Sequence, residues 1–217
     1  MTEADLRRDI VAACRDLAAS GLIPGTAGNI SARVGSDMLI TPSGIPYDHL
    51  APEMLATMAL DGSGDWQGPE KPSSEWRFHH DILAARPHDQ AIVHTHSPHA
   101  TALSTTRQPI PPAHYMIAAF GGASVRVSAY ARFGTQALSD AALLALKDRY
   151  ACLLANHGAI ATGDSLARAI WRAEELETLA QQYILSMSAG GPVLLTEAEI
   201  AEASEAFKTY GPRKPDS

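Results

Sequence analysis

The clearest periodic pattern of hydrophobic and polar residues marks a helix at each end of the chain. Near the N-terminus, apolar residues recur with the 3.6-residue period of a helix that Thr2 can cap and Gly21 can end. This apolar face consists of Leu6, Ile10, Val11, Cys14 and Leu17. A longer amphipathic run predicts a helix from Ser165 to about Met187. A capping box that begins at Thr196 predicts a last helix ending near Phe207.

Between these helices the chain alternates between short apolar runs and turn residues. The apolar runs predict strands over residues 30–34, 38–41, 56–60, 91–97, 125–127 and 150–155. Helical patterns lie among them, over residues 75–86 and 139–147. Because helices and strands are interspersed, the sequence predicts a layered α/β domain rather than an all-β one.

The composition is that of a folded protein with a large core. Of 217 residues, 46% are hydrophobic and 19% are charged, so we expect one domain over residues 1–210 and a C-terminal tail over residues 211–217. The net charge of −7 and the lack of a long basic run argue against nucleic acid as a partner. No signal-peptide pattern and no run of about 18 apolar residues is present, so we expect no membrane partner and a cytoplasmic location. Cys14 and Cys152 lie in apolar patterns and are expected to be buried free thiols.

Two histidines end the most apolar of the short runs. In AIVHTHS, over residues 91–97, His94 and His96 are two positions apart, so their side chains leave a strand on the same face. A third histidine, His157, follows the apolar run at residues 153–155. Three imidazole ligands suit zinc. Taken alone, a His-x-His pair is more often two surface or hydrogen-bonded histidines than a metal site.

Three short polar turns could bind an anion. They are Gly28-Asn29, Ser43-Gly44 and Ser73-Ser74, and the last lies at the start of a predicted helix. If the three turns converged in space, their N–H and hydroxyl groups could hold a phosphate without any lysine. As separate segments they are ordinary turns and caps, and the sequence does not show convergence.

Glu75 directly follows the third turn. An acidic residue at the start of a helix is favoured by the helix dipole alone. Beside a metal, the same carboxylate could be a fourth ligand and a base. The helix that follows contains His79 and His80, which we interpret as packing or surface histidines.

Eight sequence blocks occur in the order found in one known family. They are GTAGNIS (25–31), LITPSGIPY (39–47), KPSSEWRFH (71–79), AIVHTHSPH (91–99), AHYMIAAFGG (113–122), YARFGT (130–135), ANHGAIA (155–161) and FKTYGPR (207–213). Through these blocks the chain resembles the zinc-dependent class II aldolases of the fuculose-phosphate aldolase type, relatives of the ribulose-phosphate 4-epimerases. The resemblance runs almost from end to end.

The resemblance implies a fold, an assembly and a metal site. Such proteins look like three-layered α/β/α domains with a central, mainly antiparallel sheet. They assemble as homotetramers with active sites between subunits. One Zn²⁺ per subunit would be bound by Glu75, His94, His96 and His157.

The resemblance also implies roles for residues around the metal. Glu75 would double as catalytic acid and base, and Tyr115 would reach in from the adjacent subunit. Tyr210, together with Phe133, would close over the aldehyde part of the substrate. The positions expected to bind the substrate phosphate are Gly28, Asn29, Ser43, Gly44, Ser73 and Ser74.

The expected reaction is zinc-dependent retro-aldol cleavage of a phosphorylated ketose, L-fuculose 1-phosphate, to dihydroxyacetone phosphate and L-lactaldehyde. Sugar-phosphate epimerases, dehydratases and decarboxylases of the same superfamily remain alternatives. Epimerases tend to carry aspartate where this chain has Glu75, which favours the aldolase. A non-catalytic assembly module is an alternative of another class, and the intact ligand set argues against it.

Overall fold

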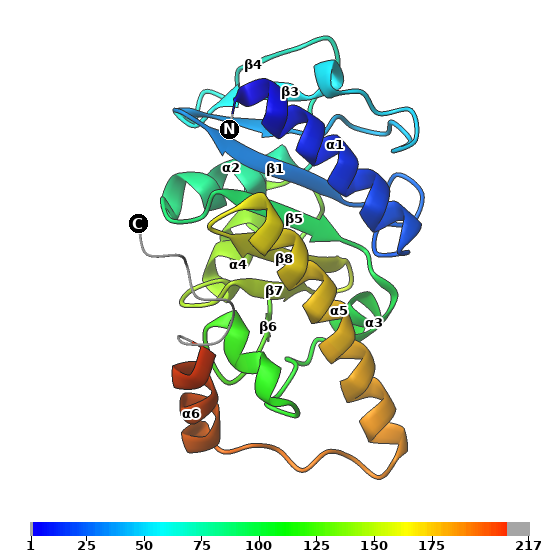
Figure 1. Ribbon diagram of the computed structural model, residues 1–217, viewed down its shortest axis with the longest axis vertical. Coiled ribbons are helices and arrows are strands. Elements are labelled where there is room, and N and C mark those ends of the chain that lie inside the picture. The colour runs from blue at the N-terminus through cyan, green and yellow to red at the C-terminus, as the bar shows by residue number, and fades with distance from the viewer. Residues whose placement is uncertain (1, 208–217) are drawn as a thin grey trace, which may run out of the picture.

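Eight strands form one sheet in the computed structural model, which describes residues 2–207 (Figure 1). The strands are β1 (Asn29–Val34), β2 (Asp37–Ile40), β3 (Ala56–Ala59), β4 (Trp66–Gln67), β5 (Ala91–Thr95), β6 (Arg126–Val127), β7 (Ala151–Leu154) and β8 (Gly158–Gly163). Their order across the sheet is β4-β3-β2-β1-β5-β8-β7-β6. The β6–β7 pair is parallel and the other described pairs are antiparallel, which confirms the mainly antiparallel sheet.

Helices cover both faces of this sheet. They are α1 (Glu3–Ala19), α2 (Trp76–Ala85), α3 (Pro98–Thr106), α4 (Gln136–Ala145), α5 (Leu166–Ser188) and α6 (Glu197–Phe207), with 3₁₀ helices η1 (Pro52–Met54) and η2 (Tyr115–Phe120). One apolar cluster joins α1, α3 and α5 to one face, and a second joins α2 and α4 to the other (Figure 1). The three-layered α/β/α architecture is therefore confirmed.

Strand β5 shows how the sheet divides the core. Ala91 and Val93 belong to the cluster under α1 and α5, whereas Ile92 belongs to the cluster under α2 and α4. His94 faces the second side as well, where the ring of Phe78 from α2 meets its imidazole edge-on at 5.4 Å. This alternation places a polar side chain at the end of a fully buried strand.

Most predicted elements are present, and three were missed. The predicted helices at both ends are confirmed, including the capping box in which Thr196 and Glu199 exchange hydrogen bonds. Helix α3 was not predicted because three of its residues are β-branched threonines and it has no clear apolar face. Strand β8 was not predicted because glycine and alanine fill four of its six positions, so it lacks a run of large apolar side chains. Strand β4 has only two residues.

Helix α3 is held at its N-terminus by a carboxylate from α5. Glu177 accepts hydrogen bonds of 2.9 Å from the backbone N–H groups of both His99 and Ala100, and it contacts His99 Nδ1 at 2.7 Å. Burial alone would raise the pKa of Glu177, but these hydrogen bonds outweigh burial and lower it. The charged carboxylate therefore fixes α3 against α5.

Expectations from composition can also be compared with the structure. Cys14 and Cys152 are buried free thiols, as predicted. Among the described helices, none has an 18-residue stretch apolar enough to cross a membrane. Tyr210 and the predicted tail over residues 211–217 lie outside the described residues.

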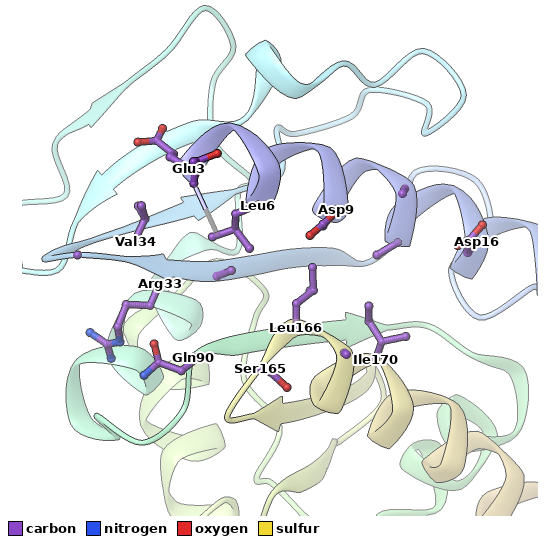
Figure 2. Close-up of a pocket in the computed structure, with 16 residues that line it drawn as sticks. Glu3, Leu6, Asp9, Asp16, Arg33, Val34, Gln90, Ser165, Leu166 and Ile170 are labelled. Atoms are coloured by element: carbon purple, nitrogen blue, oxygen red, sulfur yellow. The ribbon is translucent and has the colours of Figure 1, made fainter. Parts of the chain in front are cut away.

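A pocket of about 600 Å³ lies between α1 and the first turns of α5 (Figure 2). Apolar side chains such as Leu6, Leu166 and Ile170 line it, and Asp9 and Asp16 project from α1. This pocket lies beside the start of β5, whereas the histidines stand at the end of that strand. None of the residues that the sequence predicts for the site lines it.

The Phe78→Ala variant tests how much the packing of α2 against the sheet contributes to stability. Its side chain is 1% exposed, so Phe78→Ala should lower the free energy of unfolding by about 3–5 kcal/mol through lost burial and a residual cavity. Urea unfolding at matched protein concentration measures this loss. Phe133→Ala is the matched control, because Phe133 is 61% exposed and should cost about 0.5 kcal/mol or less. Equal losses in the two variants would show that α2 does not depend on this contact.

Candidate active site

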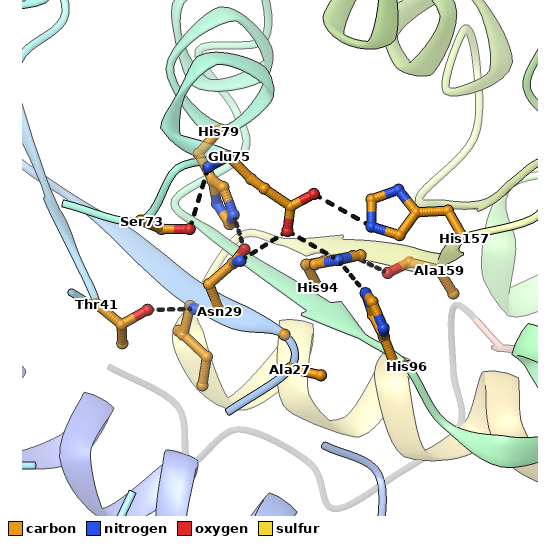
Figure 3. A network of polar contacts seen from close by, with 12 residues as sticks. Ala27, Asn29, Thr41, Ser73, Glu75, His79, His94, His96, His157 and Ala159 are labelled. Carbon is orange, nitrogen blue, oxygen red and sulfur yellow. Dashed lines mark hydrogen bonds and ion pairs between the residues drawn. The ribbon is translucent and has the colours of Figure 1, made fainter. Parts of the chain in front are cut away.

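Four side chains converge at the end of β5 (Figure 3). Glu75, His94, His96 and His157 each direct one ligand atom into a shared space, and these atoms all lie within 4.8 Å of one another. His94 is fully buried and Glu75 is 8% exposed, while His96 and His157 are half-buried. The four residues that the sequence predicts as metal ligands are thus brought together.

The register of the sheet creates this convergence. Asn29, the first residue of β1, pairs with His94 on β5, and His94 pairs with Ile160 on β8. His157 lies in the turn between β7 and β8, so the hairpin brings it beside the end of β5. Glu75 occupies the N-cap position of α2, but its side chain makes no capping hydrogen bond. Its carboxylate is directed at the histidines instead.

The nitrogens that face the shared space can present lone pairs to a cation. His94 Nδ1 lies 2.9 Å from the carbonyl oxygen of Ala159, which can only accept, so Nδ1 carries a proton and the neutral ring has its lone pair on Nε2. That Nε2 lies 3.0 Å from His96 Nε2 and 3.2 Å from Glu75 Oε2. Burial, the largest influence, lowers the pKa of His96 to about 4, so His96 is neutral at neutral pH.

Glu75 completes a donor set that fits a cation. Oε1 of Glu75 is buried without a hydrogen-bond partner in the described residues, although His157 Nε2 lies 3.1 Å away. Burial would raise the pKa of Glu75, but positive charge on the facing His94 and His157 rings and their hydrogen bonds outweigh it and hold this pKa well below its usual range. A bound cation would act on the carboxylate in the same way. Donors around one tetrahedral zinc ion lie roughly 3.3 Å apart, close to these separations. Three nitrogens and one oxygen therefore fit a metal such as zinc.

The turn that carries His157 is held by the end of α3. Ser104, which is fully buried, accepts the Asn156 N–H through its carbonyl oxygen at 3.1 Å. Its hydroxyl oxygen, at 3.3 Å, shares the His157 N–H with the carbonyl oxygen of Leu154, at 3.0 Å. Arg107 Nε donates to Asn156 Oδ1 at 2.7 Å. Since α3 begins two residues after His96, this one helix links the segments that carry two of the histidines.

Two glycines allow the backbone to approach the histidines closely. A Cβ on Gly28 would lie 2.6 Å from the His94 carbonyl oxygen, and φ at Gly28 is +82°. A Cβ on Gly158 would lie 2.4 Å from the Thr95 carbonyl oxygen. Any side chain at either position would push the strands apart. Gly28 thus has a structural reason to be glycine beside its predicted part in phosphate binding.

The three polar turns lie along connected backbone. Thr41 receives the Ser73 N–H at its carbonyl oxygen, at 3.0 Å, and donates its own N–H to Ile30. The Ser43 N–H is bonded to the carbonyl oxygen of Lys71 at 3.1 Å. The segments that carry Asn29, Ser43-Gly44 and Ser73-Ser74 are therefore neighbours, which is the convergence that the sequence left open.

An open pocket of about 290 Å³ adjoins the cluster. Glu75, His96 and His157 form its floor, and Ser74 and Asn156 contribute polar groups. Its other walls are apolar and aromatic, from Tyr130, Ala131 and Phe133. This smaller pocket, rather than the one beside α1, adjoins the four predicted metal ligands.

Tyr115 does not line this pocket in its own subunit. It stands at the start of η2, is 51% exposed, and packs against Phe207 of α6 at 6.0 Å between ring centroids. Its expected action in the site of an adjacent subunit stays a prediction. Tyr210, the other predicted aromatic, lies outside the described residues.

Comparison with known proteins identifies the family. The family described as Class II Aldolase and Adducin N-terminal domain matches residues 8–184. The chain belongs to the class II aldolase family. A solved structure of an L-fuculose 1-phosphate aldolase is 36% identical and matches the fold of this aldolase with a TM-score of 0.91. The match covers 96% of this chain and 98% of the other.

Two relatives of this aldolase carry different substrate names. A 5-methylthioribulose-1-phosphate/5-deoxyribulose-1-phosphate aldolase from Rhodospirillum rubrum is 50% identical over 206 residues, covering 95% of this chain and 92% of the relative. An L-fuculose phosphate aldolase from Escherichia coli O6:H1 is 47% identical over 209 residues, covering 96% of each. The predicted family and enzyme class, a lyase, are confirmed.

The structure also adds residues that the sequence did not assign to the site of the aldolase. His79 is buried, as a packing histidine would be, but its ring also bonds the side chains of Asn29 and Ser31. Its spacing of four from Glu75, one helical turn, was the available signal. Ser104 had no such signal because it lies on α3, which was not predicted.

Ser104→Ala tests whether α3 positions His157. The substitution removes the hydroxyl that shares the His157 N–H with the Leu154 carbonyl oxygen, so the affinity for Zn²⁺ should fall roughly tenfold. Competition with a chromophoric chelator measures this affinity. Thr105→Ala is the matched control, because the exposed Thr105 hydroxyl bonds only Ala102 within α3. If both variants bound Zn²⁺ as the wild type does, the hydroxyl of Ser104 would have no part in positioning His157.

Proposed function

We propose that this aldolase cleaves a ketose 1-phosphate between C3 and C4, using Zn²⁺ bound by Glu75, His94, His96 and His157. The observation that carries the proposal is the convergence of four lone-pair donors beside three connected polar turns. A Zn²⁺ ion bound there would act as a Lewis acid toward the negative charge that develops on the substrate as the bond breaks. The donor set of three imidazoles and one carboxylate supports zinc over harder cations.

The polar turns would bind the phosphate. Backbone N–H groups near Gly28 and Gly44 and the hydroxyls of Ser43, Ser73 and Ser74 are donors without positive charge. Ser73 and Ser74 immediately precede Glu75, the residue that begins α2, so the dipole of that helix adds to the attraction. Asn29 would add its amide. Binding the phosphate here places the C1 end of the substrate on the Glu75 side of the cluster.

Glu75 would be the proton carrier at C3. Its low pKa keeps it ionised, which is the form that removes a proton from C3 of dihydroxyacetone phosphate in the direction of condensation. In the direction of cleavage the same group returns that proton to C3. Tyr115 of an adjacent subunit would exchange a proton with the C4 oxygen, which becomes the aldehyde oxygen, and Tyr210 with Phe133 would close over the aldehyde.

The part of the substrate beyond C4 would lie against the aromatic wall. Tyr130 and Phe133 line the pocket on its open side, and they suit an apolar end such as a methyl or methylthio group. L-fuculose 1-phosphate, which yields L-lactaldehyde, is the first candidate. The relative that is 50% identical favours 5-methylthioribulose 1-phosphate as the second.

We propose a quaternary structure and a cellular location as well. The exposed position of Tyr115, away from the pocket of its own subunit, supports a homotetramer whose active sites lie between subunits. We also propose that residues 1–210 act as one domain in the cytoplasm, with residues 211–217 as a tail.

Glu75→Gln tests the proton carrier. Removing general acid–base catalysis typically costs 10²–10⁴-fold, so kcat should fall by about 10²-fold or more. The three histidines remain, so the variant should still contain measurable zinc by metal analysis. Glu174→Gln, on the exposed side of α5, is the control and should keep wild-type kcat. A Glu75→Gln enzyme with a near-normal rate would rule Glu75 out as the proton carrier.

A substrate panel tests the reaction itself. Release of dihydroxyacetone phosphate should be fast from L-fuculose 1-phosphate or 5-methylthioribulose 1-phosphate, and should stop with a chelator and return with Zn²⁺. The ratio of kcat/KM between the two identifies the aldehyde that the pocket accepts. A change of configuration in L-ribulose 5-phosphate without triose phosphate would instead make the protein an epimerase.

A further inference from the structure

A chain of buried hydrogen bonds runs from β1 through α2 to Glu75. Ser31 Oγ lies 2.7 Å from His79 Nδ1. Figure 3 shows the next two contacts, in which His79 Nε2 is bonded to Asn29 Oδ1 and Asn29 Nδ2 donates to Glu75 Oε2 at 3.0 Å. Ser31 and His79 are fully buried, and Asn29 is 4% exposed. The last contact in the chain is with the proposed proton carrier.

The carboxylate at one end decides the direction of every bond. An ionised carboxylate only accepts, so Asn29 must turn its NH₂ group toward Glu75 and its carbonyl oxygen toward His79. His79 must then donate from Nε2, which leaves Nδ1 to accept from the Ser31 hydroxyl. Burial, the largest influence, lowers the pKa of His79 to about 3, so the ring has one proton to place.

The opposite arrangement is unfavourable. If His79 carried its proton on Nδ1, its bare Nε2 would attract the Asn29 NH₂ group. The amide would then present its carbonyl oxygen to Glu75 at about the present 3.0 Å, and two acceptors would face each other in a buried site. The tautomer of His79 and the orientation of Asn29 are therefore coupled.

We propose that His79 is a positioning residue that locks the Asn29 amide with its NH₂ group toward Glu75 and the anion site. Within residues 2–207, Asn29 Nδ2 has one acceptor, Glu75, so its second N–H is available to a substrate phosphate. Asn29 thereby contacts both the anion site and the Glu75 carboxylate. His79 ensures that Asn29 is the hydrogen-bond donor in both contacts. This inference rests on the proposed function for the roles of Glu75 and of the phosphate.

The tautomer of His79 can be measured directly. In zinc-loaded protein labelled with ¹⁵N-histidine, long-range ¹H–¹⁵N correlation should show His79 neutral and protonated at Nε2, its signals identified by their absence in His79→Gln. Protonation at Nδ1 would overturn the proposal. This result does not depend on the reaction that the enzyme catalyses.

Substitutions test the consequence for ligands. His79→Leu removes the donor, so the affinities for Zn²⁺ and for inorganic phosphate should each fall roughly tenfold or more. His79→Gln can present an N–H in the place of Nε2 and should recover most of both. Ser31→Ala removes the donor to His79 Nδ1, so the ring can adopt either tautomer, and the effect on both affinities should be intermediate. This variant still tests the proposal if His79→Leu does not fold.

His80→Leu is the matched control for a purely structural loss. His80 is also buried on α2, but it bonds Gly62 and Asp81, away from the cluster. It should lose stability and keep both affinities. Wild-type affinities in folded His79→Leu and Ser31→Ala would overturn the proposal. Wild-type protein that releases no triose phosphate from any ketose 1-phosphate would instead refute the proposed function, while the tautomer still tests His79.

Discussion

Four potential metal-binding atoms held within 4.8 Å of one another, on side chains that are buried or half-buried, are the constraint on which this structure depends. While the imidazoles are neutral, their lone pairs and the negative charge of Glu75 repel one another. A cation removes that repulsion. The protein must hold these groups together before the cation arrives, so the surrounding frame must be stiff.

The frame consists of backbone contacts more than of side-chain contacts. The ladder β1–β5–β8 sets His94 between Asn29 and Ile160, and Gly28 lets the preceding loop touch the His94 carbonyl. Helix α3 acts as a brace, since Glu177 holds its start just after His96 and its end holds the turn of His157. Each of the three histidines is thus fixed through its own main chain. The fourth predicted ligand, Glu75, is fixed through its hydrogen bond with Asn29.

The same arrangement separates the chemistry from the choice of substrate. The cluster and the polar turns lie on strands and helix ends inside the fold, whereas Tyr130 and Phe133 stand on the open side of the pocket. Relatives at 47% and 50% identity carry names of different phosphorylated sugars. This fits a buried part of the site that is shared and a pocket entrance that varies. Under the proposed function, differences in a few exposed side chains would change which aldehyde is accepted and leave the proposed metal ligands unchanged.

Much of this aldolase was determined by the sequence itself. Helical periodicity located α1 and α5, strand alternation put His94 and His96 on one face, and the ordered blocks identified the family. These are local signals, so short stretches suffice to read them. Only the tertiary structure decided which polar turns meet, how α3 braces His157, and that His79 orients Asn29. Those contacts join residues from 28 positions apart, for Ser43 and Lys71, to 53 positions apart, for Ser104 and His157, so their geometry is set by the tertiary fold rather than by local propensity.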